Sequence, residues 1–267
     1  MAKRKRRSTK KSIARRLKEG RGKGRLADYK PWLHIQDVPS QGLACRAKGW
    51  KTNRVHQMLS LLELLYFYIA EWALQVVDIR EQYPLLPIEE TLAIARNCGI
   101  RHPTDPKTKD PIVMTTDFVL TVRQGDSDID QPQTVKYRSD LFSLRTLEKL
   151  EIERRYWEAR GKELKIVTEC SIPKVLAKNV QWLHPYRRFQ DFTDLNDLVL
   201  SLIASIVLNT LRTRNAPLYE ITISLDDELG LEGGTCLAIT RHLLANRVIR
   251  VDMLKPINPR ARLILLN

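Results

Sequence analysis

Two short stretches decide how this sequence is interpreted: MTTDFVLTV at residues 114–122 and QTVKYR at residues 133–138. Apolar and polar residues alternate in both, as they do in half-buried β-strands. Each stretch also holds one charge that a buried strand rarely carries, the carboxylate of Asp117 and the ammonium of Lys136. Opposite charges on two successive strands indicate either a functional site or two solvent-facing side chains.

The residues around these strands alternate between helical and strand-like patterns. Helices are predicted at residues 58–75, 88–99 and 143–161, and strands at residues 76–87, 113–122, 134–138 and 164–169. Residues 124–133, QGDSDIDQPQ, have the composition of a loop between two of the strands. This order of elements predicts a mixed α/β domain over residues 27–170.

The remaining sequence has a different pattern, which begins after a linker at residues 171–193. The expected elements are an apolar helix at 194–211, a short helix at 224–231 that Ser224 caps, a second helix from 233, and strands near 248–251 and 261–267. Three helices and a two-stranded hairpin are the order of a winged helix-turn-helix, so residues 194–267 are predicted to form such a domain. Domains of this kind bind either DNA or proteins.

The length and the charge distribution agree with two domains and add a basic arm. Single hydrophobic cores stop growing at about 250 to 300 residues. A chain of 267 residues is therefore long enough for one full core and a smaller second one. Its net charge is +14, and residues 1–26 hold thirteen of the 45 Lys and Arg but only one acid, Glu19. The other residues come to +2, so the basicity belongs to a flexible arm at residues 1–26.

Three interpretations of the arm are open. It could neutralise DNA phosphates, bind acidic lipid headgroups or only solubilise the chain, although it lacks the bulky apolar face of a lipid-binding helix. We expect binding to DNA. In the arm, the residues expected to contact DNA are Lys3, Arg4, Lys5, Arg6, Arg7, Arg15 and Arg16. In the C-terminal domain they are Arg241 and Arg247, in the helix predicted from residue 233 and at its end.

Export and membrane insertion are not expected. No apolar stretch follows the basic start, as a signal peptide would require. The most apolar segment, residues 58–77, contains Glu63 and Glu71, and each acid costs about 2.5 to 3.5 kcal/mol at the centre of a bilayer. The four cysteines are far apart and form no C-x-x-C pair, so neither zinc nor disulfides are indicated. The expected location is the cytoplasm.

Four charged residues interrupt the apolar patterns of the first domain: Glu63, Asp117, Lys136 and Glu153. Mg²⁺ prefers carboxylate oxygens, which Glu63 and Asp117 can supply, and a nearby lysine could orient a water or stabilise charge on a phosphate. This set suits hydrolysis of a phosphodiester. From the spacing alone, a salt-bridged helix residue, an edge-strand charge and a solvent-facing lysine explain the residues as well.

The whole string resembles a known family. The runs that carry the resemblance, in this order and spacing, are IARRLKEGRGKGR, DYKPWLHIQDVPSQG, VHQMLSLLE, VVDIREQYPLLP, TTDF and RTLEKLEIERRYW. They are similar to the TnsA endonucleases, subunits of heteromeric bacterial cut-and-paste transposases. The similarity is strong over residues 13 to about 184, and in the C-terminal part it lies mainly in the order of the elements.

The resemblance implies a fold, an activity and its partners. TnsA-like proteins have a type II restriction endonuclease-like catalytic domain and cut the 5′ strands at transposon ends with Mg²⁺, for which Mn²⁺ is expected to substitute. Their partners are DNA, the transposase TnsB and the ATPase regulator TnsC. By position, Glu63 and Asp117 match the metal-binding carboxylates of the family, and the Val135 carbonyl would complete the metal shell. Lys136 matches the catalytic lysine, and Glu153 matches a further acid of the family.

One position departs from the family pattern. The residue two before the lysine is Gln in this family and an acid in most related nucleases, whereas this chain has Thr134. Thr134 could bind the metal through a water, or Gln133 could take the role. The departure leaves a second hypothesis open, a catalytically weak adaptor that links transposase, ATPase and DNA. A stand-alone restriction or repair nuclease is the third.

Overall fold

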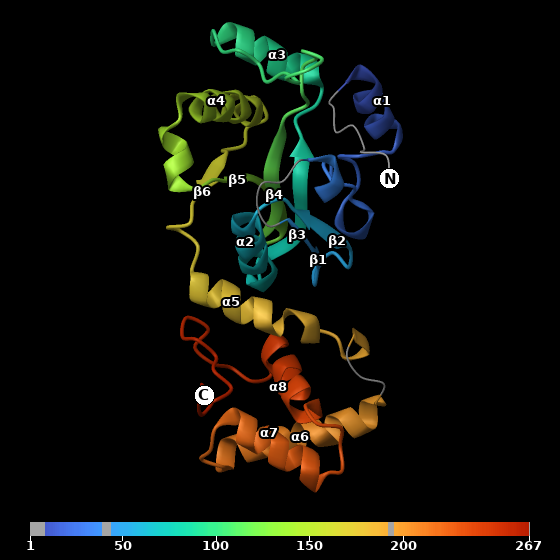
Figure 1. Ribbon diagram of the computed structural model, residues 1–267, viewed down its shortest axis with the longest axis vertical. Helices are drawn as coiled ribbons and strands as arrows, with labels where there is room; N and C mark the ends of the chain where they lie inside the picture. The colour runs from blue at the N-terminus through green and yellow to red at the C-terminus, as the bar shows by residue number, and fades with distance from the viewer. Residues whose placement is uncertain (1–8, 39–43, 192–194, 267) are drawn as a thin grey trace. The chain divides into compact units, whose positions relative to one another are not determined.

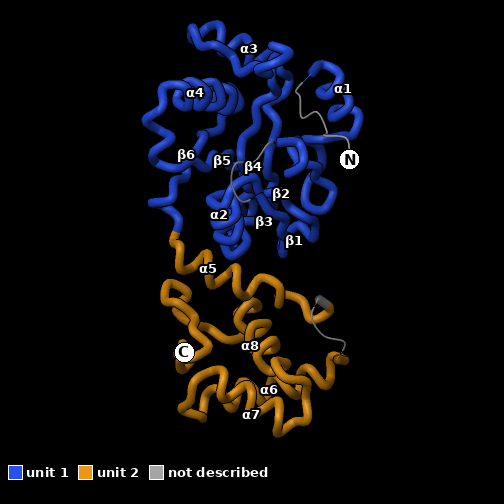
Figure 2. Tube along the Cα trace, in the orientation of Figure 1, with its two compact units in different colours: residues 1–172 blue, residues 173–267 orange. Residues whose placement is uncertain are grey.

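The computed structural model describes residues 9–38, 44–191 and 195–266 (Figure 1). The chain divides into two compact units, residues 1–172 and residues 173–267, which Figure 2 shows in different colours. Each unit is described by itself below. Within the described ranges, no helix combines the length and the apolar character that a membrane crossing requires.

A four-stranded mixed sheet is the centre of the first unit. Its strands, in spatial order, are β3 (Val76–Pro84), β4 (Thr115–Gln124), β5 (Ser127–Val135) and β6 (Lys165–Val167). Strand β4 is antiparallel to both of its neighbours, β3 and β5, and β6 pairs with β5 in parallel. A separate two-stranded sheet is formed by β1 (Cys45–Lys48) and β2 (Val55–Met58). The predicted α/β class is therefore confirmed.

The hairpin between β4 and β5 corrects the predicted loop at residues 124–133. The pairing runs without interruption from Phe118 with Gln133 to Gln124 with Ser127, so most of the expected loop is strand. The turn needs only two residues, and Gly125 adopts a φ of +59° that favours glycine. The charges that made the stretch look like a loop are exposed or paired, as Arg123 is with Asp128 at 3.1 Å.

Three helices pack around this sheet: α2 (Leu61–Trp72), α3 (Ile88–Asn97) and α4 (Leu144–Glu158). The ring of Tyr66 on α2 packs edge-on against Phe118 of β4. On α4, Tyr156 and Trp157 join Leu85 and Val119 in a buried apolar cluster. These contacts fix both helices on β4, the strand that carries Asp117.

The expectation of a flexible arm over residues 1–26 is wrong for its second half. Helix α1 (Lys10–Lys18) begins at Thr9, whose hydroxyl accepts a hydrogen bond from Ser12 N. Arg21 is buried, and its guanidinium donates to the carbonyl of Trp32 at 3.0 Å and to Asp37 at 2.5 Å. A carboxylate and an aromatic residue downstream therefore hold this basic segment on the first unit, which its composition alone did not reveal.

The described residues of the second unit form helices and irregular segments and contain no strand. Its helices are α5 (Lys174–Leu183), α6 (Asp197–Thr213), α7 (Leu218–Glu228) and α8 (Thr235–Ala245). Helix α5 corrects the predicted linker at 171–193, because Ala177, Val180 and Leu183 are fully buried within this unit. The apolar helix expected at 194–211 corresponds to α6.

Helix α7 begins at Leu218, six residues before the predicted cap Ser224. Leu218, Ile221 and Leu225 are spaced three and four residues apart and form one buried helical face, so the helix extends well before the predicted cap. Ser224 lies inside the helix, where its hydroxyl donates to Glu228 at 2.6 Å.

The predicted wing hairpin does not form in the described residues. The segments near 248–251 and 261–266 approach each other through a hydrogen bond from Leu266 N to the Arg250 carbonyl, yet neither is a strand. The carbonyls of Pro259 and Ala261 instead accept hydrogen bonds from the first amides of α7, at 2.9 and 3.0 Å. Residues 259–261 thus accept hydrogen bonds from N–H groups that have no partner within α7. These hydrogen bonds compete with the pairing of the segment as a strand.

Candidate active site

Asp117 is the centre of a cluster at the adjoining ends of β4 and β5. One of its oxygens, Oδ2, accepts three hydrogen bonds: from Thr134 Oγ1 at 2.9 Å, from Val135 N at 2.7 Å and from Lys136 Nζ at 2.6 Å. The antiparallel register sets this contact, because Phe118 pairs with Gln133 and the strands continue side by side from there. The two charges noticed in the sequence are therefore partners.

The ammonium of Lys136 lies between two oxygens. It donates to Asp117 Oδ2 and also, at 3.1 Å, to the carbonyl of Val135. Burial alone lowers the pKa of this lysine, but the charge of Asp117 and its hydrogen bond outweigh that effect and raise it. Lys136 is thus a cation at neutral pH, with about a third of its side chain (32%) exposed.

Glu63 is held at the first turn of α2 by the helix start itself. Ser60 caps the helix by accepting from Glu63 N, and its hydroxyl donates back to Glu63 Oε1 at 3.0 Å. Leu59 N donates to Oε2 at 3.0 Å. Burial, followed by the charge of Asp117, raises the pKa of Glu63 to about 7. Two carboxylates that influence each other in this way form a site that favours a cation.

Glu153 on α4 is the most deeply buried acid of the predicted set. Its Oε1 has no hydrogen-bond partner among the described residues. Burial, together with the charge of Asp117, raises its pKa to about 8. Nearby, Trp157 Nε1 donates to Thr116 Oγ1 at 2.7 Å and fixes α4 beside the strand position before Asp117. The four predicted residues therefore lie in one electrostatically coupled region.

The donor set fits a hard divalent cation. Asp117 Oδ2 and the Val135 carbonyl converge on the ammonium of Lys136, which shows that both oxygens face one point of positive charge. Glu63 adds a second buried carboxylate, and carboxylate with carbonyl oxygens is the donor chemistry of Mg²⁺. In the described ranges, no three His, Cys, Asp or Glu side chains cluster as a ready-made metal cage. Mg²⁺, which usually keeps several waters, does not need one.

The two alternative ligands are both engaged within the protein. Thr134 is buried and donates its hydroxyl to Asp117, so it orients the carboxylate. The carboxamide oxygen of Gln133 accepts from the hydroxyl of Tyr66, on the same helix as Glu63. Both residues therefore support the site through neighbours in this structure.

The predicted DNA contacts have different outcomes. Lys3, Arg4, Lys5, Arg6 and Arg7 lie outside the described residues. Arg15 is exposed beside Glu19. Arg16 is buried, which contradicts the predicted contact of this residue with DNA. Its guanidinium is buried near Asp37, at 3.8 Å, and over the ring of Trp32, so it holds the fold.

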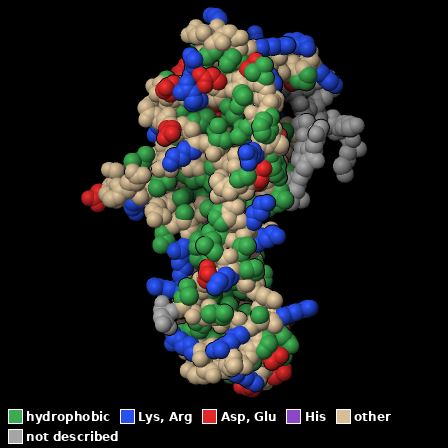
Figure 3. Space-filling model, turned by 90° about the vertical axis from the view of Figure 1, so that its left-hand side faces the viewer, with side chains coloured by type: hydrophobic (Ala, Val, Ile, Leu, Met, Phe, Trp, Pro, Cys, Tyr) green, Lys and Arg blue, Asp and Glu red, His purple; other side chains and the backbone are tan. Residues whose placement is uncertain are grey.

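Arg241 of the second unit is also involved in internal structure, whereas the predicted contact of Arg247 stays a prediction. The Arg241 guanidinium lies over the rings of Trp182 and Tyr186 and donates to the Trp182 carbonyl at 3.1 Å. Arg247 follows α8 and is partly buried. On the face drawn in Figure 3, Lys and Arg side chains are scattered among hydrophobic ones and do not form one large basic patch.

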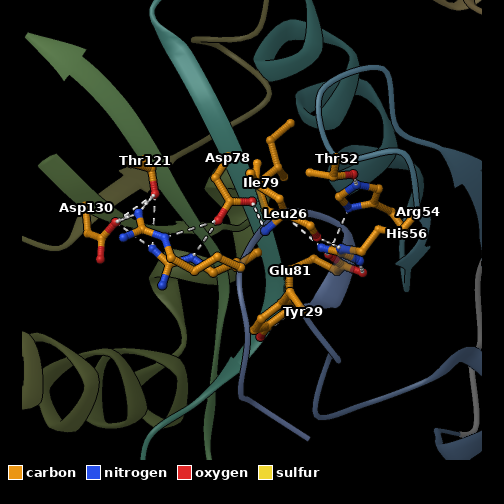
Figure 4. Close-up of polar contacts among 12 residues, drawn as sticks. Leu26, Tyr29, Thr52, Arg54, His56, Asp78, Ile79, Glu81, Thr121 and Asp130 are labelled. Carbon is orange, nitrogen blue, oxygen red and sulfur yellow. Dashed lines mark hydrogen bonds and ion pairs between the residues drawn. The ribbon is translucent and has the colours of Figure 1, made fainter. Parts of the chain in front are cut away.

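Sequence reasoning missed a buried network on β3 (Figure 4). The carboxylate of Glu81, which is fully buried, accepts from Arg54 Nη1 at 2.8 Å and contacts His56 Nδ1 at 2.8 Å. The other ring nitrogen of His56 contacts Thr52 Oγ1 at 2.7 Å. A hydroxyl, an imidazole and a carboxylate in this order resemble a nucleophilic triad, but complete burial denies a substrate access. The strand pattern DIREQ, with three charges in five residues, was the available signal.

The fold and the site together define an α/β protein with a carboxylate and lysine centre on a mixed sheet, and comparison with known families names its class. The TnsA-like endonuclease N-terminal family matches residues 74–169, and the TnsA endonuclease C-terminal family matches residues 171–253. The chain belongs to the TnsA endonuclease family. Asp117, Lys136 and Glu153 lie within the first match.

A curated relative supports this membership over nearly the whole chain. The chain is 38% identical to the Transposon Tn7 transposition protein TnsA of Escherichia coli over 243 residues. The alignment covers 91% of this chain and 86% of the relative. Both family matches and this identity agree with the resemblance that the sequence motifs carry.

Proposed function

We propose that this protein is a Mg²⁺-dependent DNA endonuclease that cleaves the 5′ strands at transposon ends during cut-and-paste transposition. The observation that carries the proposal is the convergence of Asp117 Oδ2 and the Val135 carbonyl on the Lys136 ammonium, next to the buried Glu63. Membership of the TnsA endonuclease family supplies the reaction class and the biological setting. The sheet and its site also suit the restriction endonuclease-like fold expected from the sequence.

Each residue of the site has a role in this proposal. Glu63, Asp117 and the Val135 carbonyl would hold the metal, which supplies Lewis-acid stabilisation of charge on phosphate oxygens. Lys136 would stabilise the negative charge that builds on the scissile phosphate, because its ammonium is already fixed at the site. Thr134 orients Asp117 through its hydrogen bond, so a threonine is compatible with an active site here.

The partners are proposed on the basis of the family. We expect the protein to act with the transposase TnsB, which cuts and joins the 3′ strand, and with the ATPase regulator TnsC. We propose that the second unit contacts TnsC and DNA. Its helices expose several apolar side chains, such as those of Leu202 and Ile223. Mn²⁺ is expected to replace Mg²⁺ because it accepts the same oxygen donors.

A strand-specific nicking assay tests the proposal. Supercoiled plasmid with cognate transposon ends would be incubated with Mg²⁺, TnsB and the wild-type protein, or with Asp117→Asn, Glu63→Ala or Lys136→Ala. We expect cuts on the 5′ strands with wild type only. If TnsB cuts its own strand and wild type adds no 5′ cut, the protein is an adaptor on a nuclease fold, as the Thr134 departure would then suggest.

A further inference from the structure

Gln82 has an unusual backbone inside strand β3. Its φ is +49°, in the left-handed region that residues other than glycine rarely adopt, and its side chain is buried. Its neighbours Glu81 and Tyr83 pair with Phe118 and Thr116, so Gln82 occupies the register position opposite Asp117. Strained residues of this kind persist where the surroundings hold them, often at functional sites.

The side chain of Gln82 bridges the sheet to the helix that carries Glu63. Its Nε2 donates to Glu63 Oε2 at 3.2 Å. Its Oε1 accepts from the hydroxyl of Thr115 at 3.3 Å, which orients the amide so that the NH₂ group faces Glu63. The backbone carbonyl of Gln82 also accepts from Trp32 N at 3.1 Å. Three contacts from three segments thus fix this one residue.

The origin of the bonds to Glu63 is informative. Leu59 and Ser60, which also donate to its carboxylate, belong to the turn that begins α2. Among the described residues with a hydrogen bond to this carboxylate, Gln82 alone comes from the sheet that carries Asp117. It therefore fixes one proposed metal ligand relative to the other, whereas Leu59 and Ser60 fix Glu63 only relative to its own helix.

We infer that Gln82 is a positioning residue that sets the distance and orientation of Glu63 toward the proposed cation site. The inference rests on the proposed function, because it assumes that Glu63 and Asp117 share a metal ion. Groups that hydrogen-bond to metal-binding carboxylates typically change metal affinity or activity by about 10- to 100-fold when they are removed. A residue that only fills the core would affect stability and leave that affinity unchanged.

Two variants separate these roles. Gln82→Asn keeps an amide, and Asn tolerates positive φ well, but it is one methylene too short to bridge Thr115 and Glu63. Gln82→Met keeps the length and removes the donor. Gln124→Met is the matched control, since Gln124 is exposed at the tip of the β4–β5 hairpin. Thermal unfolding of each variant shows whether the fold is retained.

The decisive measurement is Mn²⁺ binding by calorimetry to the full-length protein, without DNA or turnover. We expect the Kd for Mn²⁺ to rise about tenfold or more in both Gln82 variants and to stay unchanged in Gln124→Met. If one variant does not fold, Thr115→Val, which releases the amide while Gln82 stays, is expected to weaken binding in the same direction.

The outcomes distinguish this inference from the proposed function. If wild type binds Mn²⁺ and nicks DNA, and folded Gln82 variants bind as tightly as wild type, the positioning role is wrong and the proposed function stands. If wild type neither binds Mn²⁺ nor nicks, both are overturned. Weaker binding in Gln82→Asn and Gln82→Met, with Tm and the Gln124→Met control unchanged, supports the positioning role.

Discussion

Lys136 Nζ lies 2.6 Å from Asp117 Oδ2. The ammonium stands where two oxygens proposed to bind a metal, those of Asp117 and Val135, both point. A cation of the protein and a bound metal would therefore compete for the same oxygens, although the proposed function assigns a role to both. The effect of Lys136 on metal binding is therefore expected to be opposite to its proposed effect on catalysis.

Lys136→Met tests that expectation. The variant removes the competing ammonium, so the affinity for Mn²⁺ should equal or exceed that of wild type. Nicking should fall by about 100-fold or more, because a fixed donor to the developing charge is lost. Calorimetry without DNA and the plasmid assay measure the two effects. Arg138→Met, an exposed basic residue two positions on, is the control. Loss of both metal binding and nicking would show that the lysine instead shapes the metal site.

Metal binding should depend on pH through Glu63. Burial and the charge of Asp117 raise the pKa of Glu63 to about 7, so below that pH a metal must displace a proton. The apparent affinity for Mn²⁺ should rise by about tenfold per pH unit below pH 6, by about fivefold between pH 6 and 7, and level off above about pH 8. Calorimetry in two buffers with different ionisation enthalpies counts the released proton. Binding without proton release at pH 6 would contradict the raised pKa.

Glu153→Gln should stabilise the metal-free protein in base. Burial raises the pKa of Glu153 to about 8, so the folded state holds a proton that the unfolded state has lost above its ordinary pKa. The wild type therefore has its full free energy of unfolding only below the ordinary pKa of a glutamate. It loses part of it progressively as the pH rises from there through 8. We expect the free energy of unfolding at pH 9, in urea with EDTA, to rise by about 1–3 kcal/mol in the variant.

Two controls accompany the Glu153 measurement. At pH 5 the wild type is protonated at this position, so the variant and the wild type should then unfold at similar urea concentrations. Glu158→Gln on the same helix changes an exposed acid and should have no effect at either pH. A Glu153→Gln variant that is less stable than wild type at pH 9 would show that a charged Glu153 is satisfied in the fold.

Arg54→Met should be strongly destabilising. The carboxylate of Glu81 is fully buried, and the fork of Arg54 compensates its charge, while burial lowers the pKa of His56 and keeps that ring neutral. Removing the arginine leaves a buried charge without its main partner, at a cost of about 3–5 kcal/mol. Arg123→Met is the control, because the exposed pair with Asp128 contributes only about 0–1 kcal/mol. Equal denaturation midpoints for both variants would refute this account.

Deletion of residues 1–8 should reduce the salt dependence of DNA binding. This segment holds Lys3, Arg4, Lys5, Arg6 and Arg7, and if all five neutralise phosphates, the log–log slope should become less steep by about 4.5. Deletion of residues 1–26 also removes the buried Arg16 and Arg21 and should lower the Tm. An unchanged slope in the shorter deletion would exclude the segment from the contact.

Several elements of the first unit were predicted well because each of them has a strong local signal, whereas α1, β1 and β2 were not predicted and most of β5 was predicted as a loop. Residues 76–84 and 115–124 are rich in strand-forming residues, and helices α3 and α4 end near glycines. The sequence also singled out Glu63, Asp117, Lys136 and Glu153, which the structure brings near one another, because charges in apolar elements need partners. The contacts of Gln82 could not be predicted, because they depend on a register and a positive φ that leave no pattern in the sequence.

Two of the errors share one cause, the tertiary partners of a basic segment and of an extended segment. Arg16 and Arg21 look like the rest of a disordered basic run until Trp32 and Asp37 are placed beside them. The last apolar stretch, from residue 261, has the composition of a strand, but its backbone satisfies the start of α7. Local propensity cannot contain such distant hydrogen bonds.

The anchoring of α1 limits how far residues 1–8 can extend from the first unit. Residues 1–8 span at most about 28 Å when fully extended, whereas residues 1–26 could span about 90 Å if all were free. At roughly 3.4 Å per base pair, the shorter segment covers less than one helical turn of DNA. Any protection of DNA that residues 1–8 add should therefore end within about eight base pairs of the footprint of the folded protein.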